Sequence, residues 1–241
     1  MQIVACDNYA GMSRKAARII AAQVQLKPHC VLGLATGSTP VGTYNDLVRF
    51  HKHEELDFSK VTTVNLDEYY GLNPEHEQSY RYFMQQNLFN HINIPPENTH
   101  VPDGLTRDVA KTCTEYDNLI ASLGGTDIQL VGIGENGHIA FNEPNSHFIA
   151  ETHLVDLNEN TIKANSRFFA SEADVPRQAI TMGMRSIFSA RMILLLASGS
   201  NKAAAIAGML KGPIDPQLPA SILQLHPNVM VIADQEALAL S

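Results

Sequence analysis

Short apolar segments alternate with helix-forming segments along most of this 241-residue chain. The predicted strands are residues 31–35 (VLGLA), 61–66 (VTTVNL), 128–134 (IQLVGIG), 192–198 (MILLLAS) and 229–234 (VMVIAD). The predicted helices are residues 41–53, 80–89, 108–123 and 201–210, where apolar side chains recur at helical spacing. Strands that alternate with helices predict an α/β fold with a mostly parallel, doubly wound sheet.

The segment at residues 192–198 is apolar on both alternating faces, which is typical of a central strand covered by helices on both sides. The chain length and the 44% content of apolar residues fit a single domain over residues 1–241. Residues 145–176 are less regular, and we interpret them as an excursion over the sheet. The chain contains no internal repeat and no low-complexity linker.

The amino-acid composition of the chain limits the kinds of molecule that it can bind. The formal net charge of −8 argues against general binding of nucleic acid, because that affinity depends on clustered Lys and Arg. No apolar run approaches the length that spans a bilayer, and the N-terminus lacks a secretory signal pattern, so we expect no membrane partner. Cys6, Cys30 and Cys113 show no C-x-x-C spacing, which favours a reduced, cytoplasmic setting.

Two polar motifs that follow predicted strands are candidate anion sites. Ligands of parallel sheets bind outside the carboxyl ends of the strands. ATGSTP contains Ser38 and Thr39, whose hydroxyls and backbone N–H groups could cradle an anion at a helix start. SGSNKA places Lys202 at another helix start, where it could bind the same phosphate. Each motif alone also fits an ordinary capped turn.

The motif NLDEYYGL places two adjacent acids, Asp67 and Glu68, at a strand end. Their side chains point to opposite sides, so only one of them can readily face the cleft. A carboxylate there could remove a proton from a substrate carbon, and an ordinary Asp is ionised at neutral pH. A pair of solvated turn acids is the alternative interpretation.

The stretch VGIGENGHIAFNEP contains a complete G-x-G-x-x-G pattern, but its context differs from that of a dinucleotide site. Such a site requires a helix to begin at the glycines, and Pro144 opposes one there. We interpret the glycines as hinges of a tight loop that places His138 and Glu143 near one another. An imidazole beside a carboxylate can exchange protons near neutral pH. A buried structural His in a glycine turn is the alternative.

These motifs together predict proton transfer on a phosphorylated sugar without a cofactor or a metal. No cluster in the sequence has convincing metal-ligand spacing, since the His51 and His53 rings diverge at i, i+2 on a helix. No serine or cysteine nucleophile context is found either.

Six motifs together resemble the glucosamine-6-phosphate deaminase family: LGLATGSTPVGTY, NLDEYYGL, GIGENGHIAFNEP, ANSRFF, LLLASGSNKA and SILQLHP. The resemblance extends from about residue 31 to about residue 234, in the family's order, and GHIAFNEP is its most specific part. It implies a Rossmann-like, three-layer αβα fold with an active-site lid at residues 145–176. It also implies conversion of glucosamine 6-phosphate and water to fructose 6-phosphate and ammonia.

The resemblance assigns roles residue by residue. Asp67 matches the base that moves a proton from C2 to C1, His138 the residue that handles the ring-oxygen proton, and Glu143 its carboxylate partner. The substrate phosphate contacts would be Ser38, Thr39, Arg167 and Lys202.

The chain departs from the family pattern at two places. Asn136 stands where other members carry Asp, and we expect its amide to orient His138 by hydrogen bonding. His153 and Val155 replace basic residues that bind an effector in longer, hexameric members, so we expect no allosteric activation. The short C-terminus favours a monomer and leaves a homo-oligomer open.

Two other functions remain to be distinguished. A 6-phosphogluconolactonase shares the fold but typically carries GHTASLFP-like residues where this chain has GHIAFNEP. A sugar-phosphate-sensing module without catalysis would tolerate loss of Asp67, His138 and Glu143, and all three are present.

Overall fold

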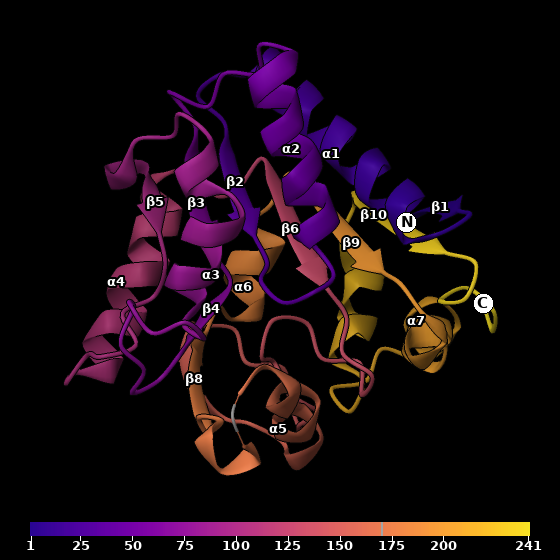
Figure 1. The fold of residues 1–241 in the computed structure, drawn as a ribbon. Coiled ribbons are helices and arrows are strands. Elements are labelled where there is room, and N and C mark those ends of the chain that lie inside the picture. Colours follow the sequence, from indigo (N-terminus) through magenta and orange to yellow (C-terminus); the bar gives the residue numbers. More distant parts are fainter. Residues whose placement is uncertain (170) are drawn as a thin grey trace.

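The computed structural model describes residues 1–169 and 171–241. Its centre is a seven-stranded sheet in the order β1-β10-β9-β6-β2-β3-β5 (Figure 1). The strands are β1 (Gln2–Cys6), β2 (Val31–Leu34), β3 (Thr62–Asn65), β5 (Thr99–His100), β6 (Ile128–Gly132), β9 (Met192–Ala197) and β10 (Val229–Asp234). Every pairing in this sheet is parallel, so the predicted α/β fold with a parallel sheet is confirmed.

Helices connect these strands. They are α1 (Tyr9–Leu26), α2 (Val41–His53), α3 (Tyr80–Asn87), α4 (Val109–Ser122), α5 (Glu159–Asn165), α6 (Met184–Phe188) and α7 (Ala203–Lys211). Because crossovers between parallel strands are right-handed, the strand order assigns α1, α2 and α3 to one face of the sheet and α4, α6 and α7 to the other. Figure 1 shows α1 and α2 side by side in front of the sheet. Within the described residues, no helix has both the length and the apolar character needed to cross a membrane.

The direction of winding reverses between β2 and β6, which are neighbours in the sheet. From β2 the chain continues outward to β3 and β5, and from β6 it continues the opposite way to β9 and β10. Such a reversal leaves a crevice at the carboxyl ends of the two strands, where ligands of open α/β sheets bind. In Figure 1 the arrowheads of β2, β6 and β9 point toward the end of the molecule that carries α5.

The central strands are buried because helices cover both faces of the sheet. All residues of β9 after Met192 are buried, as are Ile128–Val131 of β6. The edge strand β1 is different, since Ile3 is 49% exposed. This burial pattern agrees with the apolar character of residues 192–198 in the sequence.

The excursion at residues 145–176 has more regular structure than the sequence indicated. It contains α5 and the strand β7 (His153–Asp156), which pairs antiparallel with β8 (Gln178–Thr181). β8 in turn pairs with β4 (Asp67–Tyr69), giving a second, three-stranded sheet. The sequence lacked a signal for β7 because this four-residue strand is only partly buried and shows no clear alternation.

Candidate active site

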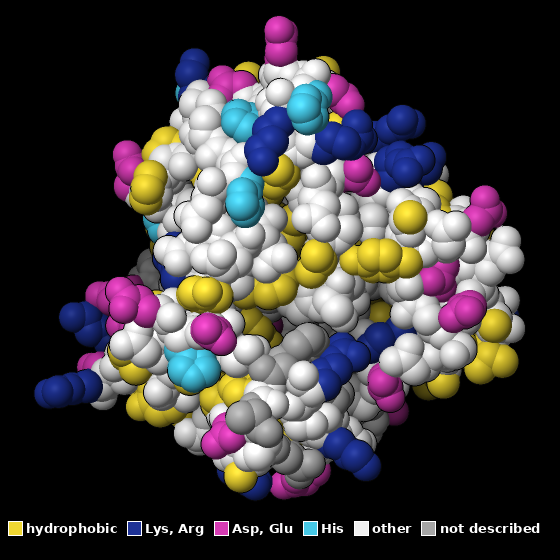
Figure 2. Space-filling model, viewed as in Figure 1, with side chains coloured by type: hydrophobic (Ala, Val, Ile, Leu, Met, Phe, Trp, Pro, Cys, Tyr) yellow, Lys and Arg dark blue, Asp and Glu magenta, His cyan; other side chains and the backbone are white. Residues whose placement is uncertain are grey.

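A cavity of about 930 Å³ lies at the carboxyl ends of β2, β6 and β9. Figure 2 shows it as a hollow across this face, with Lys and Arg side chains gathered at it. The loops after these strands form one side, and α5 with the residues after it forms the other. The lining residues that the argument uses are Ser38, Thr39, Tyr80, Glu135, Asn136, His138, Phe141, Thr161, Lys163, Asn165, Arg167, Asn201 and Lys202.

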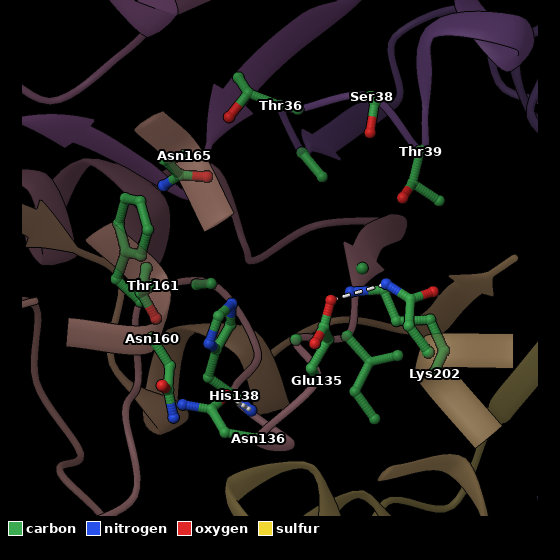
Figure 3. A pocket seen from close by; sticks show the side chains of 18 of the residues that line it. Thr36, Ser38, Thr39, Glu135, Asn136, His138, Asn160, Thr161, Asn165 and Lys202 are labelled. Atoms are coloured by element: carbon green, nitrogen blue, oxygen red, sulfur yellow. Dashed lines mark hydrogen bonds between the residues drawn. The ribbon is translucent and has the colours of Figure 1, made fainter. Parts of the chain in front are cut away.

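The loop between β2 and α2 presents the predicted hydroxyl groups to the cavity. Figure 3 shows the side chains of Ser38 and Thr39 along its upper edge. A residue outside the predicted site holds this loop: Gly42 N–H donates to the Tyr9 hydroxyl at 2.8 Å, and that hydroxyl donates to the Ser38 carbonyl at 3.0 Å. Tyr9 begins α1, far from the loop in sequence, so no local motif signalled this contact.

Among the residues that the structure describes, three cations line the cavity, and the sequence analysis named two of them, Lys202 and Arg167. An Arg167 guanidinium nitrogen lies 3.2 Å from Ser38 Oγ, which places this cation beside the β2–α2 loop. Burial lowers the pKa of Lys202, Glu135 acts against that effect, and the positive charge of Arg167 adds to it. The third cation is Lys163 on α5. An anion between these side chains would relieve their mutual repulsion and replace lost hydration.

Glu135 is an acid in this cationic region. Its Oε1 accepts a hydrogen bond of 2.7 Å from Asn201 Nδ2, drawn as a dashed line in Figure 3. The bond links the loop after β6 to the turn after β9 that carries Lys202.

The two adjacent acids follow β3 and are the first residues of β4, and they have different surroundings, as the alternation of side chains along a strand predicts. Glu68 accepts hydrogen bonds from Ser79 Oγ and from the backbone N–H groups of Tyr69, Tyr80 and Arg81, so it caps the start of α3. Asp67 is 6% exposed and follows Leu66, a residue of the cavity wall. Of the two acids, Asp67 is therefore the one available to take part in a reaction at the cavity.

The charge state of Asp67 differs from the sequence-based expectation. Burial, with a smaller contribution from the charge of Glu68, raises the pKa of Asp67 to about 8. Within the described residues no hydrogen bond compensates this effect. The expectation of an ordinary ionised aspartate was wrong for the ligand-free site, because an unpaired buried carboxyl keeps its proton at neutral pH.

The glycines after β6 shape the loop that carries His138, and no helix follows them. A Cβ at Gly134 would lie 2.4 Å from two atoms of the His138 ring, so only glycine leaves room for that ring. Gly137 has φ of +82°, a conformation that glycine adopts without strain. The interpretation as hinges of a tight loop is confirmed for Gly134 and Gly137, whereas Gly132 is the last residue of β6.

His138 and Glu143 meet in this loop. His138 Nδ1 lies 3.5 Å from Glu143 Oε2, and no hydrogen bond to Nδ1 is found within the described residues. Asn136 Nδ2 donates to the same Oε2 at 2.8 Å, and Asn136 Oδ1 accepts from the His138 backbone N–H at 3.2 Å. The expected contact of Asn136 with His138 is therefore to the backbone, while its amide nitrogen positions Glu143.

The pKa of Glu143 lies below its usual range. Burial raises this pKa, but the neighbouring His138 and the donors Thr161 and Asn136 together outweigh burial. Glu143 is thus held ionised one layer behind the cavity wall, with 8% of its side chain exposed.

Aromatic rings close the cavity beneath α5. Tyr80 and Phe141 are stacked with their centroids 6.0 Å apart, and Tyr69 lies 4.8 Å from Tyr80. The Tyr69 hydroxyl accepts from Asn165 Nδ2 at 3.0 Å. The sequence analysis did not single out these residues, although Thr161 and Asn165 lie at i, i+4 spacing just before Arg167.

Among the described residues, no group of three or more His, Cys, Asp and Glu side chains could hold a metal ion. The site thus consists of hydroxyls, cations, a neutral buried Asp67 and the His138–Glu143 pair.

Comparison with known proteins identifies relatives over nearly the whole chain. Residues 7–232 match the family described as glucosamine-6-phosphate isomerases/6-phosphogluconolactonase. A glucosamine-6-phosphate deaminase of Lachnoclostridium phytofermentans is 57% identical over 96% of this chain and 98% of its own length. The solved structure of a monomeric glucosamine-6-phosphate deaminase superposes with a TM-score of 0.98 at 48% identity, covering all of both chains. A 6-phosphogluconolactonase of Thermotoga maritima shares the fold (TM-score 0.75, 97% of this chain and 99% of that one) at 20% identity.

Proposed function

The chain belongs to the glucosamine-6-phosphate isomerase/6-phosphogluconolactonase family, and we propose that it is the deaminase that converts glucosamine 6-phosphate and water to fructose 6-phosphate and ammonia. The observation that carries this proposal is a cavity with cationic side chains that is lined by His138, with Glu143 directly behind His138 and the buried Asp67 next to the lining residue Leu66. The lactonase is less favoured because the solved lactonase of Thermotoga maritima is only 20% identical to this chain, whereas the deaminase of Lachnoclostridium phytofermentans is 57% identical.

The phosphate would bind between Ser38, Thr39, Arg167 and Lys202. Hydroxyl donors and two cations from three separate segments surround the same part of the cavity. Charge-assisted hydrogen bonds of this kind fix a ligand in position, and positioning contributes several kcal/mol to a reaction barrier. Phosphate binding at this end would direct the sugar ring toward Asp67 and His138.

His138 would open the pyranose ring. It transfers the proton of the C1 hydroxyl to the ring oxygen as the bond from C1 to that oxygen breaks, which yields a free C1 aldehyde. Glu143 stabilises the transient imidazolium because it is ionised and lies 3.5 Å from Nδ1. Asn136 contributes to this step through the hydrogen bond that orients Glu143.

Asp67 would then act as the base. The C2–H bond breaks and its proton passes to the Asp67 carboxylate, while the substrate ammonium gives a proton to the C1 oxygen, which yields an enolamine. The proton on Asp67 then returns to C1 and leaves a protonated imine at C2. Water adds to C2, and ammonia leaves as the ketone forms. The raised pKa of Asp67 suits this role, since the protonated amine of the bound substrate would lower that pKa and ionise the carboxyl only in the complex.

We also infer that residues 145–176 act as the lid of this site and that the chain works as a monomer. Lys163, Asn165 and Arg167 from this segment line the cavity. The solved relative with a TM-score of 0.98 is monomeric. Size-exclusion chromatography with light scattering tests whether the protein is a monomer, and a mass of two or more chains would contradict that.

The deciding experiment measures ammonia and fructose 6-phosphate released from glucosamine 6-phosphate by the purified protein, with a chelator and without nucleotide. Equal amounts of both products are expected. Binding of the sugar phosphate without ammonia release would reject the deaminase and leave a lactonase or a sensor on the same fold. Hydrolysis of 6-phosphogluconolactone, assayed in parallel, separates these two.

A further inference from the structure

Helix α5 contacts the carboxylate of Glu143 directly. Thr161 Oγ1 donates to Glu143 Oε1 at 2.5 Å, and the Asn158 backbone N–H at the start of the helix lies 3.5 Å from the same oxygen. Thr161 is 4% exposed, so water does not readily replace its hydroxyl. Figure 3 shows Thr161 on the same side of the cavity as His138.

The two oxygens of Glu143 are thus held from different parts of the chain. Oε1 is held by α5, and Oε2 is held by Asn136 and faces His138. A carboxylate held at both oxygens cannot rotate, so the bond from Thr161 fixes which oxygen faces the imidazole. An ionised carboxylate only accepts hydrogen bonds, so both donors favour the charged form.

The same face of α5 also contacts the strand that carries the candidate base. Asn165 lies four residues after Thr161, one helical turn further on, and bonds the Tyr69 hydroxyl on β4. Asp67 is the first residue of that strand. One short helix thus bonds both Glu143 and a residue of the strand that carries Asp67.

We propose that Thr161 is a positioning residue whose hydroxyl holds the Glu143 carboxylate toward His138 when α5 covers the cavity. The proposal rests on the proposed deaminase function. When the hydroxyl is removed, Oε1 of Glu143 loses its nearer donor and keeps only the long contact with the Asn158 N–H, so the carboxylate becomes easier to protonate. A protonated Glu143 does not stabilise an imidazolium.

Other titratable groups near Glu143 could affect its protonation. The loop of Glu143 itself provides His138. A second cavity of about 300 Å³ borders Glu143 from behind and is also lined by His147, His153 and Asp156. α5 carries Glu159, which lies 3.2 Å from Arg177, and Lys163, which faces the main cavity. Thr161 is uncharged, so its replacement changes none of these charges.

The test compares Thr161→Val with Thr161→Ser. Valine keeps the shape and removes the donor, whereas serine keeps the donor. The matched control is Thr152→Val, because the Thr152 hydroxyl also donates to a partly buried carboxylate, Asp117 Oδ1, at 2.7 Å, and Thr152 is as buried as Thr161. We measure kcat and KM over pH, and follow the titration of the Glu143 carboxyl by NMR without substrate.

For Thr161→Val we expect a loss in kcat of roughly tenfold with a much smaller change in KM, since a hydrogen bond to a charged group is removed. The acid limb of the kcat profile and the Glu143 titration should both move to higher pH. Thr161→Ser should restore both, and Thr152→Val should move neither. An unmoved Glu143 titration in Thr161→Val, or a shift that serine does not restore, rejects the role of Thr161. Absence of ammonia release by the unaltered protein would instead reject the deaminase, while the carboxyl titration still tests the hydrogen bond.

Discussion

Replacing Asp67 with Asn should stabilise the protein while it removes the proposed proton transfer. Burial raises the pKa of Asp67 from 3.8 to about 8, so the folded chain keeps a proton that the unfolded chain loses above about pH 4. Between these values the unfolded state binds fewer protons, and each pH unit lowers the free energy of unfolding by about 1.4 kcal/mol. At about pH 7 the destabilisation by Asp67 amounts to roughly 4 kcal/mol, and the neutral amide of Asn would not contribute it.

The assay is urea unfolding of both proteins at about pH 7 and about pH 5. The chain contains no Trp, so far-UV circular dichroism reports the transition. The stability gained by Asp67→Asn should shrink to roughly 2 kcal/mol at the lower pH, because fewer pH units then separate the solution from the pKa of the unfolded chain. The same variant should bind the sugar phosphate with nearly unchanged affinity and should not exchange the C2 hydrogen with solvent.

Asp234→Asn is a control that should change the stability of the protein in the opposite direction. Donors from Ser198, Gly199 and Ala237 lower the pKa of Asp234 despite burial, so its charge stabilises the fold above the pKa of the unfolded chain. That variant should lose stability at neutral pH. A stability gain for Asp67→Asn that does not vary with pH, or no gain at all, would refute the reasoning, and unchanged C2 exchange would remove Asp67 from its role.

Four further predictions concern activity. The kcat/KM of the unaltered protein should rise with pH up to about 8, the pKa of Asp67 in the free protein. The kcat should reach its plateau at a lower pH, because the amine of the bound substrate ionises the Asp67 carboxyl. Profiles of kcat/KM and kcat that level off at the same pH would contradict this. Lys202→Met should raise KM by roughly tenfold to a hundredfold and weaken inhibition by inorganic phosphate, whereas the exposed Arg177→Met should change neither. Asn136→Asp places a second carboxylate against Glu143 Oε2, so the acid limb of the kcat profile should move to higher pH; an unmoved limb would mean that the amide does not matter. N-acetylglucosamine 6-phosphate should leave the substrate curve hyperbolic, and sigmoidal kinetics relieved by this sugar would overturn the prediction.

Much of the central sheet could be predicted from the sequence. The five predicted strands correspond to β2, β3, β6, β9 and β10, because buried parallel strands require apolar residues on both faces. The edge strand β1 and the short strands β4, β5, β7 and β8 were not predicted, since these elements are exposed, brief or paired over few residues.

For the site, the sequence by itself determined which residue types follow the strands and that the glycines form a loop instead of opening a helix. Pro144 and the small residues carry that information locally, and the spacing of His138 and Glu143 within one loop limits how far apart they can lie. Only the tertiary structure decided the charge of Asp67, because burial by distant segments sets that pKa. Only the tertiary structure also decided that Thr161 bonds Glu143, since these residues lie 18 positions apart in the sequence and no local pattern encodes where α5 returns to the loop.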